Sequence, residues 1–259
     1  MLPNFLIIGA ARCGTTSVYS VLQTHPDVYL PANKRPEPHF FLKSEEFARG
    51  LSYYEERYFS ASRGQKAIGE ASTSYVYGAD VPKRVHDALP AVRLVCMLRN
   101  PIERAFSGYW HTVASGLETM SFEEALANED SRKRELAGTA LGEVAPFAYV
   151  ERGLYAMQLR RWLEKFDRSQ LHIILFEDVL NDPDSVLADL AQFLEIDGDR
   201  FGARTFRKEN TSVPEQARMS DAVHDSLVDR FRNDVRSLEE LLGRDLSGWL
   251  APSMPVAIP

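Results

Sequence analysis

The fold of this chain is decided by residues 5–16, which read Phe5-Leu6-Ile7-Ile8-Gly9-Ala10-Ala11-Arg12-Cys13-Gly14-Thr15-Thr16. The uninterrupted apolar run over residues 5–8 predicts a strand buried on both faces of a parallel sheet. A helix is predicted from Gly14 onward, because apolar residues recur at helical spacing until Pro26. Between strand and helix, the two glycines have the Gly-x-x-x-x-Gly spacing of a phosphate-binding loop, in the context that this motif requires.

The same order of strand, turn and helix recurs along the chain. A second apolar run, residues 94–98, leads to Asn100-Pro101, a helix N-cap followed by proline at the first helical position. Further elements are predicted as a strand over 171–176 and helices over about 155–166, 183–194 and 223–242. This alternation predicts an α/β fold: a P-loop-like, doubly wound parallel sheet flanked by helices, with ligands at the carboxyl ends of the strands. Residues 1–259 are predicted to form a single domain, with surface loops at 128–142 and 204–216.

The loop over residues 9–16 favours an anionic ligand rather than a triphosphate with its metal. Backbone N–H groups and the start of the helix supply partial positive charge, and small side chains let a ligand approach the main chain. A nucleoside triphosphatase has lysine before the Ser/Thr at the end of this loop, whereas Thr15 stands there and Arg12 is the loop's cation. The alternatives are a turn that only permits close packing, and a surface arginine paired with a carboxylate.

Short motifs follow one another in a specific order through nearly the whole chain. After residues 5–16 they are His25-Pro26, Pro38-His39-Phe40-Phe41, Gly69-Glu70-Ala71-Ser72 with Tyr75, Leu98-Arg99-Asn100-Pro101 with Arg104 and Ser107, Arg152-Gly153-Leu154-Tyr155, and Phe176-Glu177-Asp178-Val179. In this order they resemble the sulfotransferases that use 3′-phosphoadenosine-5′-phosphosulfate (PAPS), most of all the glycosaminoglycan-type branch and its bacterial relatives. The resemblance implies an enzyme that transfers a sulfuryl group from PAPS to a hydroxyl, less commonly an amine, of a small-molecule, lipid or saccharide acceptor.

The resemblance also implies which residues contact the donor. The candidates are Arg12, Cys13, Gly14, Thr15 and Thr16 at the 5′-phosphosulfate, Arg99 and Ser107 at the 3′-phosphate, and Tyr155. Arg99 lies at a strand end and Ser107 lies two helical turns after Pro101, so both can face the ligand crevice at the carboxyl ends of the strands. A guanidinium together with a hydroxyl is suited to bind a ribose phosphate. Their alternatives are a strand-end arginine paired with a carboxylate and a serine bonded within its helix. The place of Tyr155 on an apolar helix face favours a core position instead.

Sulfuryl transfer requires a base for the acceptor and positive charge at the leaving phosphate, by analogy with phosphoryl transfer. Arg12 and the loop N–H groups are the candidates for the leaving phosphate. Glu37 is the candidate base, because prolines on both sides hold its backbone, and the resemblance points to the same residue. His39 is the second candidate, as base or as a residue that orients the base; its alternative is a half-buried structural histidine. Glu70 is either a substrate-side carboxylate or a strand-end partner for a basic residue.

Composition limits the possible functions. The 259 residues are 44% hydrophobic and 26% charged, and a net charge of −7 argues against a general electrostatic hold on nucleic acid or an anionic membrane. Residues 5–11 are too short a stretch to span a bilayer, and two cysteines leave little to cross-link, so a reducing cytoplasmic location is predicted. The six histidines show no metal-ligand spacing, and no metal requirement is predicted.

Two other functions compete with the sulfotransferase. One is a P-loop kinase-like transferase, and the other is a non-catalytic anion- or saccharide-binding module of the same fold. The acceptor and the oligomeric state cannot be deduced from the sequence, since acceptor pockets are built by variable loops. Further donor contacts at the C-terminal side are placed at Lys208 to Arg218.

Overall fold

A computed structural model of the chain describes residues 1–32, 37–203, 206 and 212–251. It divides into two compact units. Unit 1 consists of Met1–Arg99 and Arg161–Asn210, and unit 2 consists of Asn100–Arg160 and Thr211–Pro259. The assignment of residues 1–259 to a single domain stays a prediction, and each unit is described by itself below.

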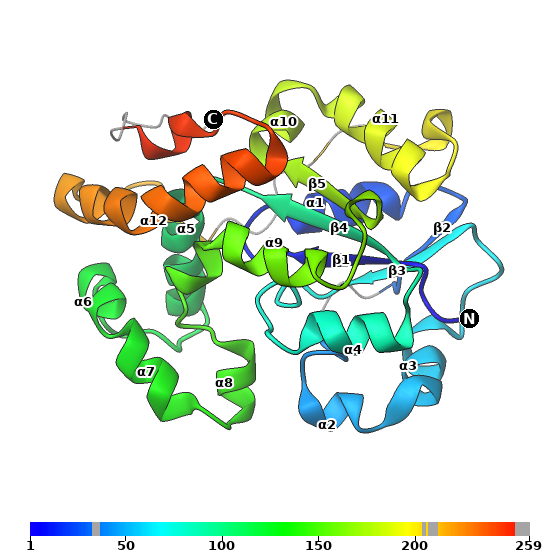
Figure 1. The fold of residues 1–259 in the computed structure, drawn as a ribbon, viewed down its shortest axis with the longest axis horizontal. Helices are drawn as coiled ribbons and strands as arrows, with labels where there is room; N and C mark the ends of the chain where they lie inside the picture. Colours follow the sequence, from blue (N-terminus) through cyan, green and yellow to red (C-terminus); the bar gives the residue numbers. More distant parts are fainter. Residues whose placement is uncertain (33–36, 204–205, 207–211, 252–259) are drawn as a thin grey trace. The chain divides into compact units, whose positions relative to one another are not determined.

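Unit 1 contains a sheet of five parallel strands in the order β2-β3-β1-β4-β5 (Figure 1). Their bounds are β1 Phe5–Gly9, β2 Val28–Tyr29, β3 Ala67–Ala71, β4 Arg93–Leu98 and β5 Leu171–Leu175. The central strand β1 pairs with β3 through Leu6 and Glu70 and with β4 through Leu6 and Leu94. The predicted parallel α/β sheet is thus confirmed, and β1, β4 and β5 lie where the apolar runs predict them. The apolar pattern does not reveal β2, which has two residues, or β3, which Gly69 and Glu70 interrupt.

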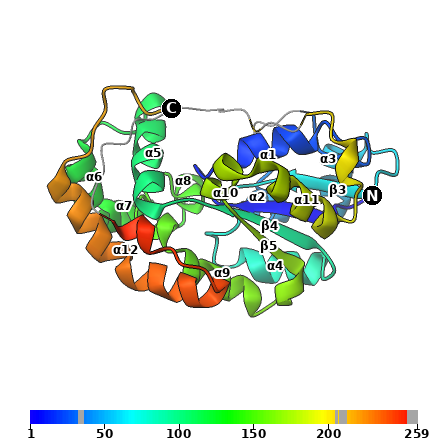
Figure 2. The same cartoon turned by 90° about the horizontal axis from the view of Figure 1, so that it is seen from above.

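Helices cover both faces of this sheet. Those of unit 1 are α1 Thr15–Leu22, α2 Ser44–Phe47, α3 Gly50–Phe59, α4 Val81–Ala88, α10 Phe176–Asn181 and α11 Pro183–Leu194, with short 3-10 turns η2 Arg168–Gln170 and η3 Gly198–Arg200. Figures 1 and 2 show α1 on one face of the sheet and α4 on the opposite face. Helix α9, Tyr155–Leu163, crosses the division between the units at residues 160 and 161. Because the strands are parallel, their carboxyl ends lie at the same edge of the sheet, and a ligand site is expected at that edge.

Aromatic side chains form the core beside β3. The rings of Phe40 and Tyr54 stack with centroids 4.3 Å apart, and Phe41 meets Tyr54 edge to face at 5.4 Å. Phe40, Phe41, Tyr54 and Phe59 have no exposed surface. Because aromatic side chains bury large apolar areas, this cluster anchors the segment that follows Glu37 to α3.

Unit 2 is helical. Its elements are α5 Pro101–Ala114, α6 Phe122–Ala127, α7 Glu129–Leu136, α8 Ala140–Val144, η1 Glu151–Gly153, α12 Asp221–Leu242 and η4 Ser247–Leu250. The side chain of Asn100 accepts hydrogen bonds from the backbone N–H groups of Ile102 and Glu103, which confirms the predicted cap of α5.

The predicted surface loop over residues 128–142 is wrong. Helix α7 and the start of α8 occupy that segment. Sequence patterns miss α7 because it has no apolar stripe, and polar contacts hold it instead: Arg132 pairs with Glu118, and Glu129 accepts hydrogen bonds from the N–H groups of Val150 and Glu151. Of the other predicted loop, 204–216, residues 204–205 and 207–211 lie outside the described part of the chain.

Candidate active site

The phosphate loop joins β1 to α1 through a backbone that requires glycine at both ends. Gly9 has φ +152° and Gly14 has φ +87°, and Arg12 between them also has a positive φ, +72°. A Cβ atom on Gly9 would lie 2.5 Å from the Val76 side chain, and one on Gly14 would lie 2.8 Å from the Phe176 ring. At both positions the backbone conformation and the close packing against neighbouring side chains require glycine.

The chemistry of the loop fits an anionic donor. Helix α1 begins at Thr15 directly after Gly14, and no side chain within the described residues caps it. The N–H groups at the start of this helix and the Arg12 guanidinium are hydrogen-bond donors of the kind that bind phosphate and sulfate oxygens. The Cys13 thiol is buried and its N–H donates to the Ala10 carbonyl at 3.2 Å; its contact with a donor stays a prediction.

Glu37 and His39 lie together at the edge of this sheet. Their side chains are each 14% exposed, and His39 Nε2 is 3.3 Å from Glu37 Oε2. Thr73, two residues after β3, binds the same carboxylate: its N–H donates to Oε2 at 2.8 Å, and its hydroxyl lies 3.1 and 3.0 Å from the two oxygens. The two predicted base candidates thus lie side by side, and Thr73 holds the carboxylate of Glu37.

Thr73 also connects this group to the phosphate loop. Its carbonyl oxygen would be 2.9 Å from a Cβ on Gly9, so the loop backbone passes directly beside the residue that holds Glu37. The carboxylate candidate for the base and the loop candidate for the leaving phosphate are therefore held by neighbouring backbone. This arrangement suits proton removal from an acceptor and stabilisation of a phosphate in one reaction.

Glu70, in strand β3, is a further carboxyl group close to Glu37 and His39, and it has no exposed surface. Tyr54 donates a hydrogen bond to Oε1 at 2.9 Å, and Ser72 donates one to Oε2 at 2.8 Å. Burial raises the pKa of Glu70 from 4.5 to about 7, against hydrogen bonds from Ser72, Tyr75 and Tyr54 that lower it. Among the described residues Glu70 bonds to hydroxyls and to no basic residue, so the expectation of a strand-end partner for a basic residue is wrong, whereas a contact with substrate stays untested and its full burial argues against it.

The candidates for the 3′-phosphate fall in different units. Arg99 follows β4 in unit 1, and its guanidinium lies over the Phe176 ring, 5.0 Å from the centroid. Ser107 lies in α5 of unit 2 and is 5% exposed. Their joint contact with a ribose phosphate stays a prediction. Tyr155, in unit 2, has no exposed surface and meets Trp249 edge to face at 6.3 Å, which agrees with a core position.

Comparison with known proteins identifies the family. Residues 2–235 match the sulfotransferase domain. The chain belongs to the sulfotransferase family. The resemblance stated from the motifs is thereby confirmed.

Three proteins illustrate how this sulfotransferase domain relates to others. A crystal structure of a sulfotransferase from Alicyclobacillus acidocaldarius is 36% identical, covers 97% of this chain and 100% of that chain, and superposes with a TM-score of 0.82. Heparan sulfate glucosamine 3-O-sulfotransferase 6 from Homo sapiens is 32% identical over 74% of this chain. The membrane-associated sulfotransferase kil1 from Dictyostelium discoideum is 26% identical over 94% of this chain. The chain spans 52% and 66% of the length of these last two relatives.

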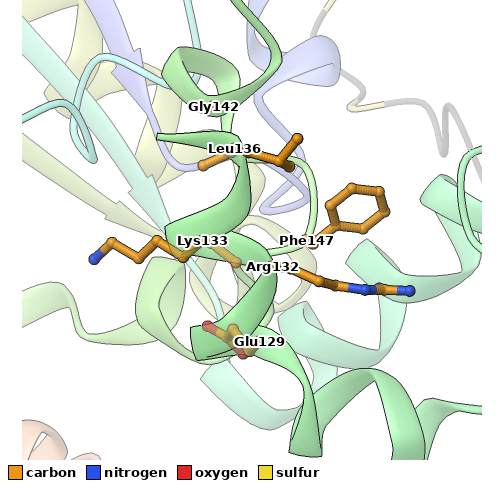
Figure 3. Close-up of a pocket in the computed structure, with 8 residues that line it drawn as sticks. Glu129, Arg132, Lys133, Leu136, Gly142 and Phe147 are labelled. Atoms are coloured by element: carbon orange, nitrogen blue, oxygen red, sulfur yellow. The ribbon is translucent and has the colours of Figure 1, made fainter. Parts of the chain in front are cut away.

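A small pocket in unit 2 of the sulfotransferase domain contains none of the predicted site residues. Its lining is Glu129, Arg132, Lys133, Leu136, Gly142, Ala145, Phe147 and Ala148. Figure 3 shows Arg132 and Lys133 extending in opposite directions from α7. Arg132 pairs with Glu118 and lies over the Phe147 ring, while Lys133 pairs with Glu151 at 2.6 Å. Because carboxylates neutralise both cations, this pocket gives no argument for an anionic ligand.

The remaining expectations have different outcomes. Of the segment placed at the donor, Lys208 to Arg218, residues 208–211 lie outside the described part, and the Arg218 guanidinium donates to the carbonyls of Glu215 and Ala217. Within residues 1–32, 37–203, 206 and 212–251, no group of three His, Cys, Asp or Glu side chains could hold a metal ion. In that same part of the chain, the helices are too short or too polar to cross a bilayer. Metal independence and a cytoplasmic location stay predictions.

Sequence reasoning missed the hydroxyl residues that hold the site. Thr73 binds Glu37, and Ser72 accepts a hydrogen bond from the backbone N–H of His39 at 2.8 Å. One signal was available, since Ser72-Thr73-Ser74 is a run of three hydroxyl residues directly after a strand. Such a run at the carboxyl end of a parallel strand indicates a site.

Proposed function

We propose that the chain transfers a sulfuryl group from PAPS to a hydroxyl of a small-molecule, lipid or saccharide acceptor. The observation that carries this proposal is the position of Thr73, which binds the Glu37 carboxylate while its carbonyl packs against Gly9 of the phosphate loop. Membership of the sulfotransferase family supports it, as does the 36% identical sulfotransferase structure that covers 97% of this chain and 100% of that chain.

In this mechanism Glu37 accepts the proton of the acceptor hydroxyl as its oxygen forms a bond to sulfur. The bond between sulfur and the 5′-phosphate oxygen breaks, and adenosine 3′,5′-bisphosphate leaves. Arg12 and the first-turn N–H groups of α1 stabilise the charge that builds on the leaving phosphate. Thr73 keeps Glu37 in place through its N–H and hydroxyl, and His39 Nε2, at 3.3 Å, orients the same carboxylate. The transferred group carries less charge than a phosphoryl group, so side chains and N–H groups replace a metal clamp.

Turnover with labelled donor tests this function. The purified chain is incubated with PAPS carrying a radioactive sulfur and with separate panels of hydroxyl acceptors, amine acceptors and saccharides. The expected result is transfer of label to a hydroxyl acceptor, with a product heavier by one SO3, and no change when a metal chelator is added. ATP turnover that depends on magnesium would support the kinase-like alternative. Thermal stabilisation by adenosine 3′,5′-bisphosphate without transfer to any acceptor would support the binding module.

A further inference from the structure

The buried carboxyl group of Glu70 has no direct role in the mechanism proposed above, although it is close to the residues that have one. Glu70 has no exposed surface, and among the described residues no lysine or arginine pairs with it. Burying a carboxyl group without a cation is costly, and a neutral side chain of the same size would stabilise the fold more. A residue that breaks this rule at the edge of an active site indicates a functional role.

The partners of Glu70 show what that role is. Ser72 donates its hydroxyl hydrogen to Glu70 Oε2 at 2.8 Å, and the Ser72 hydroxyl oxygen accepts the backbone N–H of His39 at 2.8 Å. A serine hydroxyl has one hydrogen, and the Glu70 oxygen that faces Ser72 accepts it. Glu70 therefore directs the hydrogen of Ser72 toward itself and leaves the lone pairs of Ser72 for His39.

The backbone of His39 needs such a partner. Its φ is +49°, in the left-handed region that non-glycine residues adopt at a cost, so surrounding contacts must hold it there. This conformation places the imidazole Nε2 3.3 Å from Glu37 Oε2. Tyr75 provides a parallel connection, since it bonds to Glu70 and its hydroxyl accepts the N–H of Phe41 at 3.2 Å.

We propose that Glu70 is a positioning residue of the active site, which fixes His39, and through it Glu37, by orienting the Ser72 hydroxyl. This inference rests on the proposed function for its effect on turnover. Because Glu70 has no exposed surface, we expect its loss to change the alignment of the base and to leave donor binding at the phosphate loop unchanged.

Three single variants test the proposal. Glu70→Gln keeps the size of the side chain but replaces one acceptor oxygen with an N–H donor, and Ser72→Ala removes the connecting hydroxyl. Tyr54→Phe is the matched control, because its hydroxyl donates to the same carboxyl but holds no backbone group of residues 39–41. We expect kcat to fall at least tenfold in Glu70→Gln and Ser72→Ala and to stay within threefold of the parent in Tyr54→Phe. The affinity for adenosine 3′,5′-bisphosphate should remain within twofold in all three.

The double variant Glu70→Gln/Ser72→Ala separates a connected pair from two independent effects. If Glu70 acts through Ser72, the kcat of the double variant should lie within threefold of the kcat of the slower single variant. Multiplicative losses, an unchanged kcat in Glu70→Gln, or equal losses of kcat in the Tyr54→Phe control would each overturn the proposal. So would a parallel loss of bisphosphate affinity, since that result indicates general loosening.

A measurement without turnover keeps this proposal separate from the proposed function. Amide hydrogen exchange, resolved by residue, reports the hydrogen bond of the His39 N–H directly. We expect exchange at His39 to accelerate at least tenfold in Glu70→Gln and in Ser72→Ala, while the amides of β1 and β4 exchange as in the parent. Unchanged exchange at His39 would overturn the positioning role even if the parent transfers sulfuryl groups. Accelerated exchange at His39 in the two variants, together with a parent that transfers no sulfuryl group, would support the positioning role while the proposed function fails.

Discussion

Thr73 holds the Glu37 carboxylate with two groups at once, its backbone N–H at 2.8 Å from Oε2 and its hydroxyl at 3.0 Å from the same oxygen. The two residues are 36 positions apart in the chain. The backbone bond survives any substitution other than proline, whereas the hydroxyl bond depends on the side chain. This difference makes the role of Thr73 measurable.

Replacing Thr73 with valine removes the hydroxyl and keeps the N–H. Losing one hydrogen bond to a charged group costs about 1.5–3 kcal/mol, so we expect kcat to fall by about tenfold or more. The kcat of Thr73→Ser should remain within about threefold of that of the parent, because serine keeps the hydroxyl group. Steady-state kinetics with saturating donor checks both variants, and equal rates for Val and Ser would exclude the hydroxyl from catalysis.

Glu37→Gln keeps the shape of the proposed base and removes its ability to accept a proton. We expect kcat to fall by about a hundred- to ten-thousandfold, the usual contribution of a general base. Binding of adenosine 3′,5′-bisphosphate, measured by calorimetry, should stay close to that of the parent. A Gln variant as fast as the parent would show that Glu37 is structural, and His39→Ala would then be tested for the base role.

Arg12 should contribute mainly in the transition state, where charge builds on the leaving phosphate. Arg12→Ala is expected to lower kcat by about a hundredfold or more, with the fold intact by circular dichroism. Arg12→Lys should retain much of the activity, because it keeps the positive charge although it loses the planar, bidentate hydrogen-bond geometry of the guanidinium. Turnover of Arg12→Ala close to that of the parent would remove Arg12 from the mechanism.

Arg99 and Ser107 should distinguish nucleotides with a 3′-phosphate from those without one. Arg99→Ala is expected to weaken binding of adenosine 3′,5′-bisphosphate by about ten- to a hundredfold and to affect adenosine 5′-monophosphate far less. Ser107→Ala should weaken binding of the bisphosphate less than Arg99→Ala does. Titration of both ligands checks this, and an equal loss for the two would place Arg99 near the 5′ end of the donor or in the scaffold.

The raised pKa of Glu70 predicts a pH dependence of stability. Between pH 4.5 and about 7, the folded chain keeps a proton on Glu70 that the unfolded chain has lost, so stability falls as pH rises. Relative to Glu70→Gln, the free energy of unfolding of the parent should decrease by about 3 kcal/mol over that interval. Denaturant titrations of both proteins at a series of pH values measure the difference. A constant difference would mean that Glu70 does not titrate there.

The sequence by itself determined the elements whose signals are local. The apolar run before Gly9 predicts β1, the glycine spacing predicts the loop, and Asn100-Pro101 predicts the start of α5. Each pattern reflects forces between residues a few positions apart, such as burial of one run or capping of one helix end. The order of the motifs was likewise sufficient to indicate the sulfotransferase family.

Only the tertiary structure decided how the site is held together. Glu37 meets Thr73, and His39 meets Ser72, across separations of 36 and 33 residues, and no periodicity in the chain encodes these pairs. They form because β3 pairs with β1 and so brings Ser72 and Thr73 beside the phosphate loop. The burial of Glu70 depends on the same pairing and on the aromatic cluster around Tyr54. Hydrogen bonds between distant segments depend on the packing of the whole unit, whereas strands and caps depend on their immediate neighbours.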